Sequence, residues 1–301
     1  RVPNDTHASL LYRMGTDVMS LVGINSLVPK QLSTKKVSID GGLSVISEYG
    51  VGKANVGGAR GGNPKPVAEV RTTVFPSKIH PMLCEIYSIR NISASPLVLN
   101  VPKFSQEAKT LADKGVDGSY VIRADIFGSG TYVLEPWQEI GFQVAFQAYR
   151  EKGGSMIVPD FDAEYSDRMS FIRDAIDSSL ILETPDTVIN TEFRFAKIRA
   201  SESIYRTKGG LMHGPGGESY YAALWCNDEC EYVNPFYPFL GYAVGNESAF
   251  NCYRLYSGFM NDDFKPVPSS IIAEGTDIWD GAGDRGDAAM IAHGLSRYLL
   301  A

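Results

Sequence analysis

Alternating apolar and polar residues dominate the first half of the chain. Segments rich in Val, Ile, Phe and Tyr, bounded by Gly, Pro, Asn or Asp, occur at residues 67–75, 78–92, 119–127 and 139–149. A period of two is typical of half-buried β-strands. Only residues 104–113 could form a helix between them. Consecutive strands without crossover helices predict an antiparallel β-sandwich domain over residues 1–150.

Residues 151–184 are expected to form a linker. The sequence EKGGS opens this stretch, and residues 163–179 could form one polar helix. Two features of the first half stand apart from its strands. Residues 8–22 could form a short helix, and residues 50–66 are rich in Gly and Pro, which predicts a loop.

After residue 184 the apolar period changes to 3.6, which predicts helices. Thr184 is the expected N-cap of the first helix and Pro185 its first residue. Further helices are expected over 218–233 and 247–260, with a third element running to Gly245 between them. A last helix is expected near Asp284, burying Ala288, Ile291, Ala292, Leu295, Tyr298 and Leu299. Successive helices joined by short turns favour helical hairpins over residues 185–301.

Charge and apolar runs exclude two classes of partner. The 301 residues carry a net charge of −7 and have no basic stripe, so nucleic acid is not an expected partner. The longest apolar runs are far shorter than the roughly 18 residues that a membrane span needs, so no membrane span is expected. A length of 301 residues suits two domains better than one.

The four cysteines are too few for a disulfide scaffold in a chain of this length. Cys226 and Cys230 are four residues apart, with Cys252 the obvious third candidate for a metal site. Buried apolar thiols are the favoured interpretation, and a metal site or a disulfide stays open. No metal and no cofactor is therefore predicted. The GAGDRG motif at 281–286 follows polar residues rather than a buried strand, so we interpret it as a loop entering a helix.

The stretch ESYYAALWCNDECEYVNPFYPFLGY at residues 218–242 combines acidic and aromatic side chains. On a helix, Trp225, Glu229 and Tyr232 would share one face, with Asp228 and Glu231 turning away from it. Carboxyl groups against aromatic rings suit glycoside hydrolysis, because the acid needs a dry neighbourhood and the sugar needs flat apolar faces. The alternative is that these acids are surface charges on a helical hairpin.

A second acidic cluster crowds residues 271–287 around Trp279. Its acidic members are Glu274, Asp277, Asp280, Asp284 and Asp287. Such a loop suits catalysis, hydrogen bonds to sugar or Ca²⁺, or it holds only solvated charges. His213 lies in a Gly-rich turn at 208–218 and is a further candidate for substrate binding. Trp279 and Asp280 are the candidates from the acidic loop.

The order of these segments resembles the six-hairpin glycosidase-like proteins. It runs from a β-sandwich through a linker helix to ETPD opening a long helix, a Gly-rich loop, WCND, and finally GTDIWDGAGDRGDAAM before a helix. The resemblance implies an N-terminal supersandwich followed by an (α/α)6 toroid. About two hairpins fit in residues 185–301, so we expect this toroid to be incomplete.

The resemblance also implies the chemistry. LWCND looks like the W-x-R-D or W-D-E segments in which relatives place an acidic site residue, with Asn227 at the arginine position of the first form. It implies a glycoside hydrolase in the full-length parent, with Asp228 as acid or subsite residue, Glu229 and Glu231 as alternates, and Trp225 and Tyr232 binding carbohydrate. A partner carboxylate is expected from later hairpins.

The rival hypothesis is a non-catalytic carbohydrate-binding or structural fragment of such a protein. Relatives are often exported, so a periplasmic or secreted location is expected. The exposed apolar stripe of an unfinished toroid predicts that the helices either pack on the sandwich or drive self-association.

Overall fold

The structure is a computed structural model that describes residues 14–52, 64–112, 118–207, 209–214, 223–272, 278–279 and 285–301. Contacts divide the chain into two compact units. We call Tyr12–Thr110 with Ser119–Met169 the sandwich unit and Ser170–Ala301 the helical unit. The domain boundaries expected at residues 150 and 184 stay a prediction.

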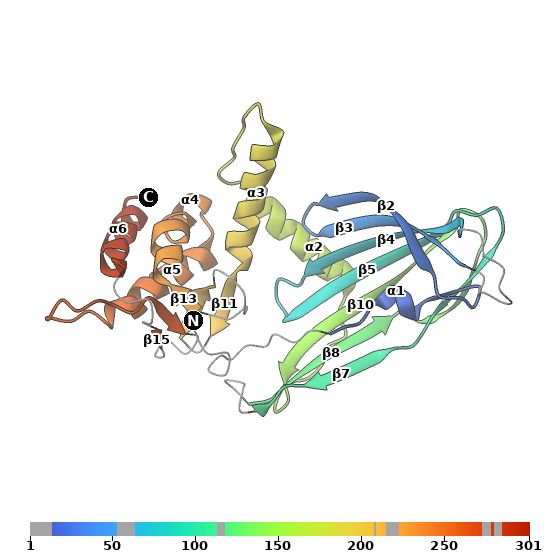
Figure 1. Cartoon of the computed structure of the whole chain (residues 1–301), viewed down its shortest axis with the longest axis horizontal. Coiled ribbons are helices and arrows are strands. Elements are labelled where there is room, and N and C mark those ends of the chain that lie inside the picture. The colour runs from blue at the N-terminus through green and yellow to red at the C-terminus, as the bar shows by residue number, and fades with distance from the viewer. Residues whose placement is uncertain are drawn as a thin grey trace. The chain divides into compact units, whose positions relative to one another are not determined.

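The sandwich unit contains a seven-stranded and a three-stranded antiparallel sheet (Figure 1). The large sheet has the order β2-β3-β4-β5-β10-β8-β7, and the small sheet has the order β1-β6-β9. The strands of the large sheet are β2 (Lys30–Ile39), β3 (Leu43–Gly50), β4 (Pro66–Pro76), β5 (Met82–Asn91), β7 (Ser105–Lys109), β8 (Tyr120–Phe127) and β10 (Glu139–Arg150). Those of the small sheet are β1 (Gly23–Ile24), β6 (Leu97–Val101) and β9 (Gly130–Leu134).

The four strands with the clearest alternation in the sequence are confirmed as β4, β5, β8 and β10. The helix considered for residues 104–113 is wrong, because β7 occupies Ser105–Lys109 and pairs with β8 at the edge of the large sheet. Backbone pairing with a neighbouring strand outweighs the local helical propensity of this short segment. Of the helix expected over 8–22, the described part is helical only at α1 (Val18–Leu21).

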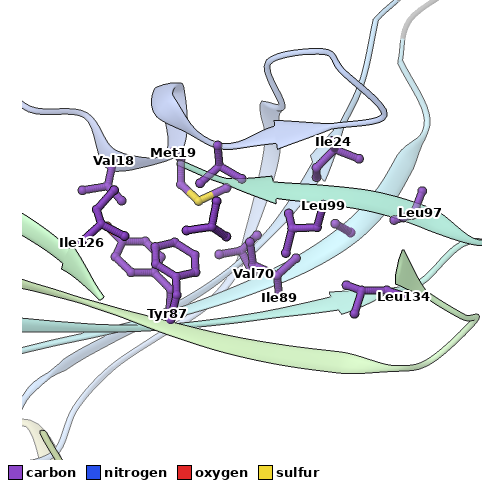
Figure 2. Close-up of a cluster of buried hydrophobic side chains, with 14 of the residues drawn as sticks. Val18, Met19, Ile24, Val70, Tyr87, Ile89, Leu97, Leu99, Ile126 and Leu134 are labelled. Atoms are coloured by element: carbon purple, nitrogen blue, oxygen red, sulfur yellow. The ribbon is translucent and has the colours of Figure 1, made fainter. Parts of the chain in front are cut away.

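The main core of the sandwich unit lies between its two sheets (Figure 2). Ile24, Leu97 and Leu99 of the small sheet belong to the same buried cluster as Val70 and Ile89 of the large sheet. The register sets Phe142 opposite Tyr87, whose ring stacks on it with centroids 4.7 Å apart. The alternating pattern therefore predicts which residues face this core.

The opposite face of the large sheet is covered by α2 (Phe161–Phe171). Phe161 packs edge-on against Phe127, and Tyr165 packs edge-on against Phe75. The helix continues as a π-helix, η3 (Ile172–Asp177). These two elements correspond to the polar helix expected over 163–179.

The helical unit combines helices with short strands. Its helices are α3 (Thr187–Glu202), the π-helix η4 (Asp228–Val233), α4 (Tyr237–Leu240), α5 (Ala243–Ser257) and α6 (Asp287–Leu300). The strands β11 (Ile204–Thr207) and β12 (Gly210–His213) form a hairpin, and β13 (Ala223–Trp225), β14 (Ser270–Ile272) and β15 (Ile278–Trp279) form an antiparallel sheet. The continuous helix expected over 218–233 is wrong, because the described part of that range holds β13 and η4.

The start of α3 differs from the expected one. The N-cap is Asp186, whose side chain accepts a hydrogen bond from the Val188 backbone N–H at 2.8 Å, so Pro185 precedes the helix. The hydroxyl group of Thr184 donates to the carbonyl group of Asp186 instead. A short acidic side chain at the N-cap satisfies a backbone donor that the helix leaves unpaired.

The buried face of α6 agrees with the expected one at Ile291, Leu295 and Tyr298 and differs from it at three other residues. Ala288, Ala292 and Leu299 are exposed, whereas Gly294 is buried and Ile291 and Leu295 pack against a core cluster. Gly294 lies so close to η4 that an added Cβ would come within 2.0 Å of the Cys230 carbonyl oxygen. Both this close contact and the packing of Ile291, Leu295 and Tyr298 therefore set the rotation of α6.

Apolar side chains remain exposed at both ends of the helical unit. Val188 and Ile189 of α3 are 70% and 48% exposed, and Leu299 and Leu300 of α6 are 72% and 87% exposed. Self-association through such helices stays a prediction. No helix in the described residues is long and apolar enough to cross a membrane.

Candidate functional site

Most of the residues expected to bind or cleave substrate lie on three neighbouring elements of the helical unit. His213 ends β12, Trp225 ends β13, and Asp228 and Glu229 open η4. Trp225 therefore does not share a helical face with Glu229 and Tyr232, as the sequence suggested, because it lies on a strand. A π-helix turns more widely than an α-helix and is frequent at functional sites.

Glu229 and His213 form a buried pair. Oε1 of Glu229 lies 3.0 Å from Nδ1 of His213, and the side chains are 0% and 10% exposed. The second carboxyl oxygen of Glu229 has no hydrogen-bond partner among the described residues. Burial raises the pKa of Glu229, and the neighbouring His213 opposes this rise. An isolated buried carboxylate is costly, so His213 is what makes this position tolerable.

Asp228 is only half-buried, whereas the adjacent Glu229 is fully buried. Burial raises the pKa of the Asp228 carboxyl group, while the charges of His213 and Arg285 lower it. Arg285 precedes α6 and lies 3.4 Å from Oδ1 of Asp287 through its Nη2. The sequence analysis did not select Arg285, and its position in the GAGDRG motif was the available signal.

Asp287 is buried and is not one of the solvated loop charges considered above. Its Oδ2 accepts a hydrogen bond from the Ser269 hydroxyl group at 3.0 Å, and its carbonyl oxygen accepts one from the Cys226 thiol at 3.3 Å. These contacts fix the first turn of α6 beside β13 and β14. Asp287 therefore supports the site rather than facing a substrate.

Two tryptophans flank one serine in the β13-β14-β15 sheet of the helical unit. Trp225 of β13 and Trp279 of β15 both pair with Ser270 of β14, from opposite sides. Two strand spacings separate their backbones by about 10 Å. The side chain of Trp225 is half-buried. The side chain of Trp279 lies outside the described residues.

The remaining candidates are less well placed. Glu231 is exposed, and Tyr232 is 64% exposed. Asp280, together with Glu274, Asp277 and Asp284, lies outside the described residues.

The cysteines form no disulfide and are all buried. Cys226, Cys230 and Cys252 belong to one core cluster beneath η4, and burial contributes to a raised pKa of each thiol. Within the described ranges no group of three His, Cys, Asp or Glu side chains is arranged to hold a metal ion. Their interpretation as buried apolar thiols agrees with these contacts.

A cavity of about 280 Å³ lies apart from these residues, beside α3. Its lining includes Asp177, Arg194 and Lys197, whose polar groups are already engaged. Arg194 pairs with Asp177 at 2.7 Å, and Nζ of Lys197 donates to three backbone carbonyl groups. None of the candidate site residues lines this cavity.

No protein-family model matches this sequence, and no curated protein matches it. Among solved structures, the chain is similar to one described as "Putative kojibiose phosphorylase from human microbiome", with a TM-score of 0.55 and 10% identity over 85% of this chain and 41% of that chain. A bacterial glucoamylase complexed with acarbose matches with a TM-score of 0.39 and 8% identity, over 83% of this chain and 44% of that one.

The first likeness shows a shared fold, and the second is too weak to support an argument. The antiparallel sandwich followed by helices of the α/α toroid type is therefore confirmed as the fold class. The chain spans less than half of the length of either structure. At 10% identity, function does not follow from the fold.

Proposed function

We propose that this chain is part of a carbohydrate-active enzyme that hydrolyses glycosidic bonds, with Asp228 as the proton donor. The observation that supports this most directly is the environment of Asp228. It is half-buried, burial raises the pKa of its carboxyl group, and it lies three residues after Trp225. A general acid for glycoside cleavage needs a carboxyl group that keeps its proton near neutral pH.

The proposed reaction begins with transfer of the Asp228 proton to the oxygen of the scissile bond. A second carboxyl group, acting as base or nucleophile, is part of the proposal and is expected from later hairpins of the full-length protein. Glu231 is a weaker candidate for the acid, because it is exposed to solvent and lacks an apolar environment that would favour its protonated form. Trp225 and Tyr232 are proposed to contact sugar rings through their apolar faces.

The test is Asp228→Asn in the full-length protein, assayed against di- and trisaccharides of glucose, mannose and galactose. We expect kcat to fall about 10²–10⁴-fold, because proton donation is lost while the shape of the side chain is kept. Glu231→Gln on the same helix is the matched control and should keep its activity. Parallel reactions with and without inorganic phosphate separate hydrolysis from phosphorolysis. Unchanged turnover in Asp228→Asn would remove Asp228 from the mechanism.

The second candidate function is carbohydrate binding without cleavage. The half-buried Trp225 and the 64% exposed Tyr232 favour it, because aromatic faces suit sugar rings. A glycan array on the protein distinguishes the two functions. Binding without any product release, also in the full-length protein, would favour this second function.

A further inference from the structure

The contact between Glu229 and His213 assigns different tasks to the two acids at the start of η4. Glu229 is 0% exposed and reaches no surface that a sugar could touch. The side chain of its partner His213 is 10% exposed, so part of the imidazole still meets solvent. A buried carboxylate that bonds a partly exposed histidine acts on a ligand only through that histidine.

The imidazole ring of His213 is held from two directions. Nδ1 lies 3.0 Å from Glu229, and the ring of Tyr237 stands edge-on at 6.3 Å between centroids. Tyr237 is itself fixed, because its hydroxyl group donates to the carbonyl oxygen of Ala200 at 2.9 Å. When Nδ1 faces an acceptor, Nε2 on the far side of the ring is left for another partner. No described residue forms a hydrogen bond with Nε2.

We propose that Glu229 is a positioning residue: it fixes His213 through Nδ1, so that Nε2 of His213 hydrogen-bonds a hydroxyl group of the carbohydrate that meets Asp228. The inference rests on the proposed function, because it assumes that a sugar occupies this site. It removes Glu229 from the candidates for the proton donor. His213 becomes the group that selects a sugar hydroxyl at a defined place.

The charges around the pair agree with this assignment. Asp228 raises the pKa of Glu229 from the same helix, and His213 is the group that lowers it. Arg285 acts on Asp228 from the segment before α6. Among the described groups of α4 and α5, those whose pKa the charge of Glu229 raises are the weakly acidic Tyr237, Cys252, Tyr253 and Tyr256. Among the described groups, His213 is thus the one with a direct hydrogen bond to Glu229.

The kinetic test compares His213→Leu, Glu229→Leu and Glu229→Gln in the full-length protein. Loss of one hydrogen bond to the sugar should raise KM about ten-fold in His213→Leu and in Glu229→Leu, with a smaller change in kcat. Glu229→Gln keeps an acceptor oxygen for Nδ1, so its KM should lie between that of Glu229→Leu and the wild type. The double variant H213L/E229L should be no worse than either single variant, since both remove the same contact. Additive losses, or an unchanged KM in Glu229→Leu, would overturn the proposal.

A second measurement does not depend on turnover. The chain has four histidines, so the ¹⁵N signals of His213 in histidine-labelled protein are identified by their loss in His213→Leu. The signal of Nδ1 should change in Glu229→Leu and be largely kept in Glu229→Gln. Adding the same di- and trisaccharides should shift the signal of Nε2 and leave that of Nδ1 in place.

Different results would contradict the role of Asp228 as proton donor and the role of Glu229 as positioning residue. If Asp228→Asn keeps full turnover while saccharide shifts Nε2, the assignment of the acid is wrong and the positioning role of Glu229 stands. If no saccharide in the panel shifts Nε2 of His213, the positioning proposal is wrong, whatever Asp228→Asn does. Thermal unfolding of each variant checks that losses come from the site, and Glu229→Gln is the variant expected to fold most nearly as the wild type.

Discussion

Among the residues that the structure describes, the sandwich unit and the helical unit differ in how many of their buried polar side-chain atoms lack a hydrogen-bond partner. In the described parts of the sandwich unit, one buried side-chain atom lacks a protein hydrogen-bond partner, Oε2 of Glu164. The helical unit contains several such residues, including Ser201, Glu229, Asn246, Ser248 and Ser270. Buried polar atoms need a partner, so these are positions where water or a ligand binds or where stability is lost.

This difference separates a scaffold from a candidate site. The core between the two sheets is built from apolar side chains in register, as the stacked pair Tyr87 and Phe142 illustrates. Around η4, by contrast, the buried groups include the carboxyl group of Glu229, His213 and the thiols of Cys226, Cys230 and Cys252. Departures from an apolar core tend to mark functional sites. The comparison therefore supports the helical unit as the location of any chemistry.

The largest effect on stability is expected from a substitution in the apolar core of the sandwich unit. Phe142→Ala should lower the free energy of unfolding of the sandwich unit by about 3–5 kcal/mol, because it opens a cavity beside Tyr87 in a tightly packed core. Hydrogen exchange read at β5 and β10, with denaturant unfolding, measures the loss. Val133→Ala is the control, since Val133 is 62% exposed and should change stability by less than about 0.5 kcal/mol. A loss below about 1 kcal/mol in Phe142→Ala would show that this core is not tightly packed.

The next effect tests the packing of the helical unit. Gly294→Ala should destabilise it by about 1–3 kcal/mol, because the added methyl group overlaps the carbonyl group of Cys230 and must push α6 away from η4. Faster hydrogen exchange in α6 and η4, with β5 and β10 unchanged, is the expected signature. His293→Ala, at an exposed neighbouring position of α6, is the control. Wild-type exchange in Gly294→Ala would mean that the two helices are not in close contact.

The smallest expected effect is the pH dependence of stability that the buried carboxyl group of Glu229 causes. Since burial raises the pKa of Glu229, the native state binds a proton that the unfolded chain has already released. Stability should therefore fall as pH rises from the ordinary glutamate pKa of 4.5 through the raised value, with a slope of at most about 1.4 kcal/mol per pH unit. Below that window this contribution is fully present.

Glu229→Gln should remove this part of the pH dependence, because glutamine does not titrate. Denaturant unfolding at a series of pH values measures the slope of the variant against that of the wild type. Glu231→Gln is the control, since exposed Glu231 lies two residues away on the same helix. If both variants show the wild-type slope, Glu229 does not carry the buried proton.

The alternating pattern was enough to predict the sandwich, and the change to a period of 3.6 was enough to predict helices after residue 184. A period of two fixes which residues of β4, β5, β8 and β10 face a core, because side chains alternate across a strand whatever the strand pairs with. The sequence also singled out Asp228, Glu229 and His213 as candidates, because few types of side chain can donate or accept a proton in catalysis. The strands formed by two short segments were not predicted from the sequence. Residues 105–109 and 223–225 are strands only because neighbouring strands supply their hydrogen bonds.

Contacts between distant segments of the helical unit determine which of the two adjacent acids is half-buried and which is fully buried. Asp228 and Glu229 are adjacent in the sequence, and nothing local distinguishes them. The π-helical turn, the hydrogen bond from β12 and the close approach of α6 at Gly294 leave Asp228 half-buried and enclose Glu229 completely. Burial, and with it the direction of a pKa, depends on contacts between segments far apart in the chain, which local periodicity does not encode.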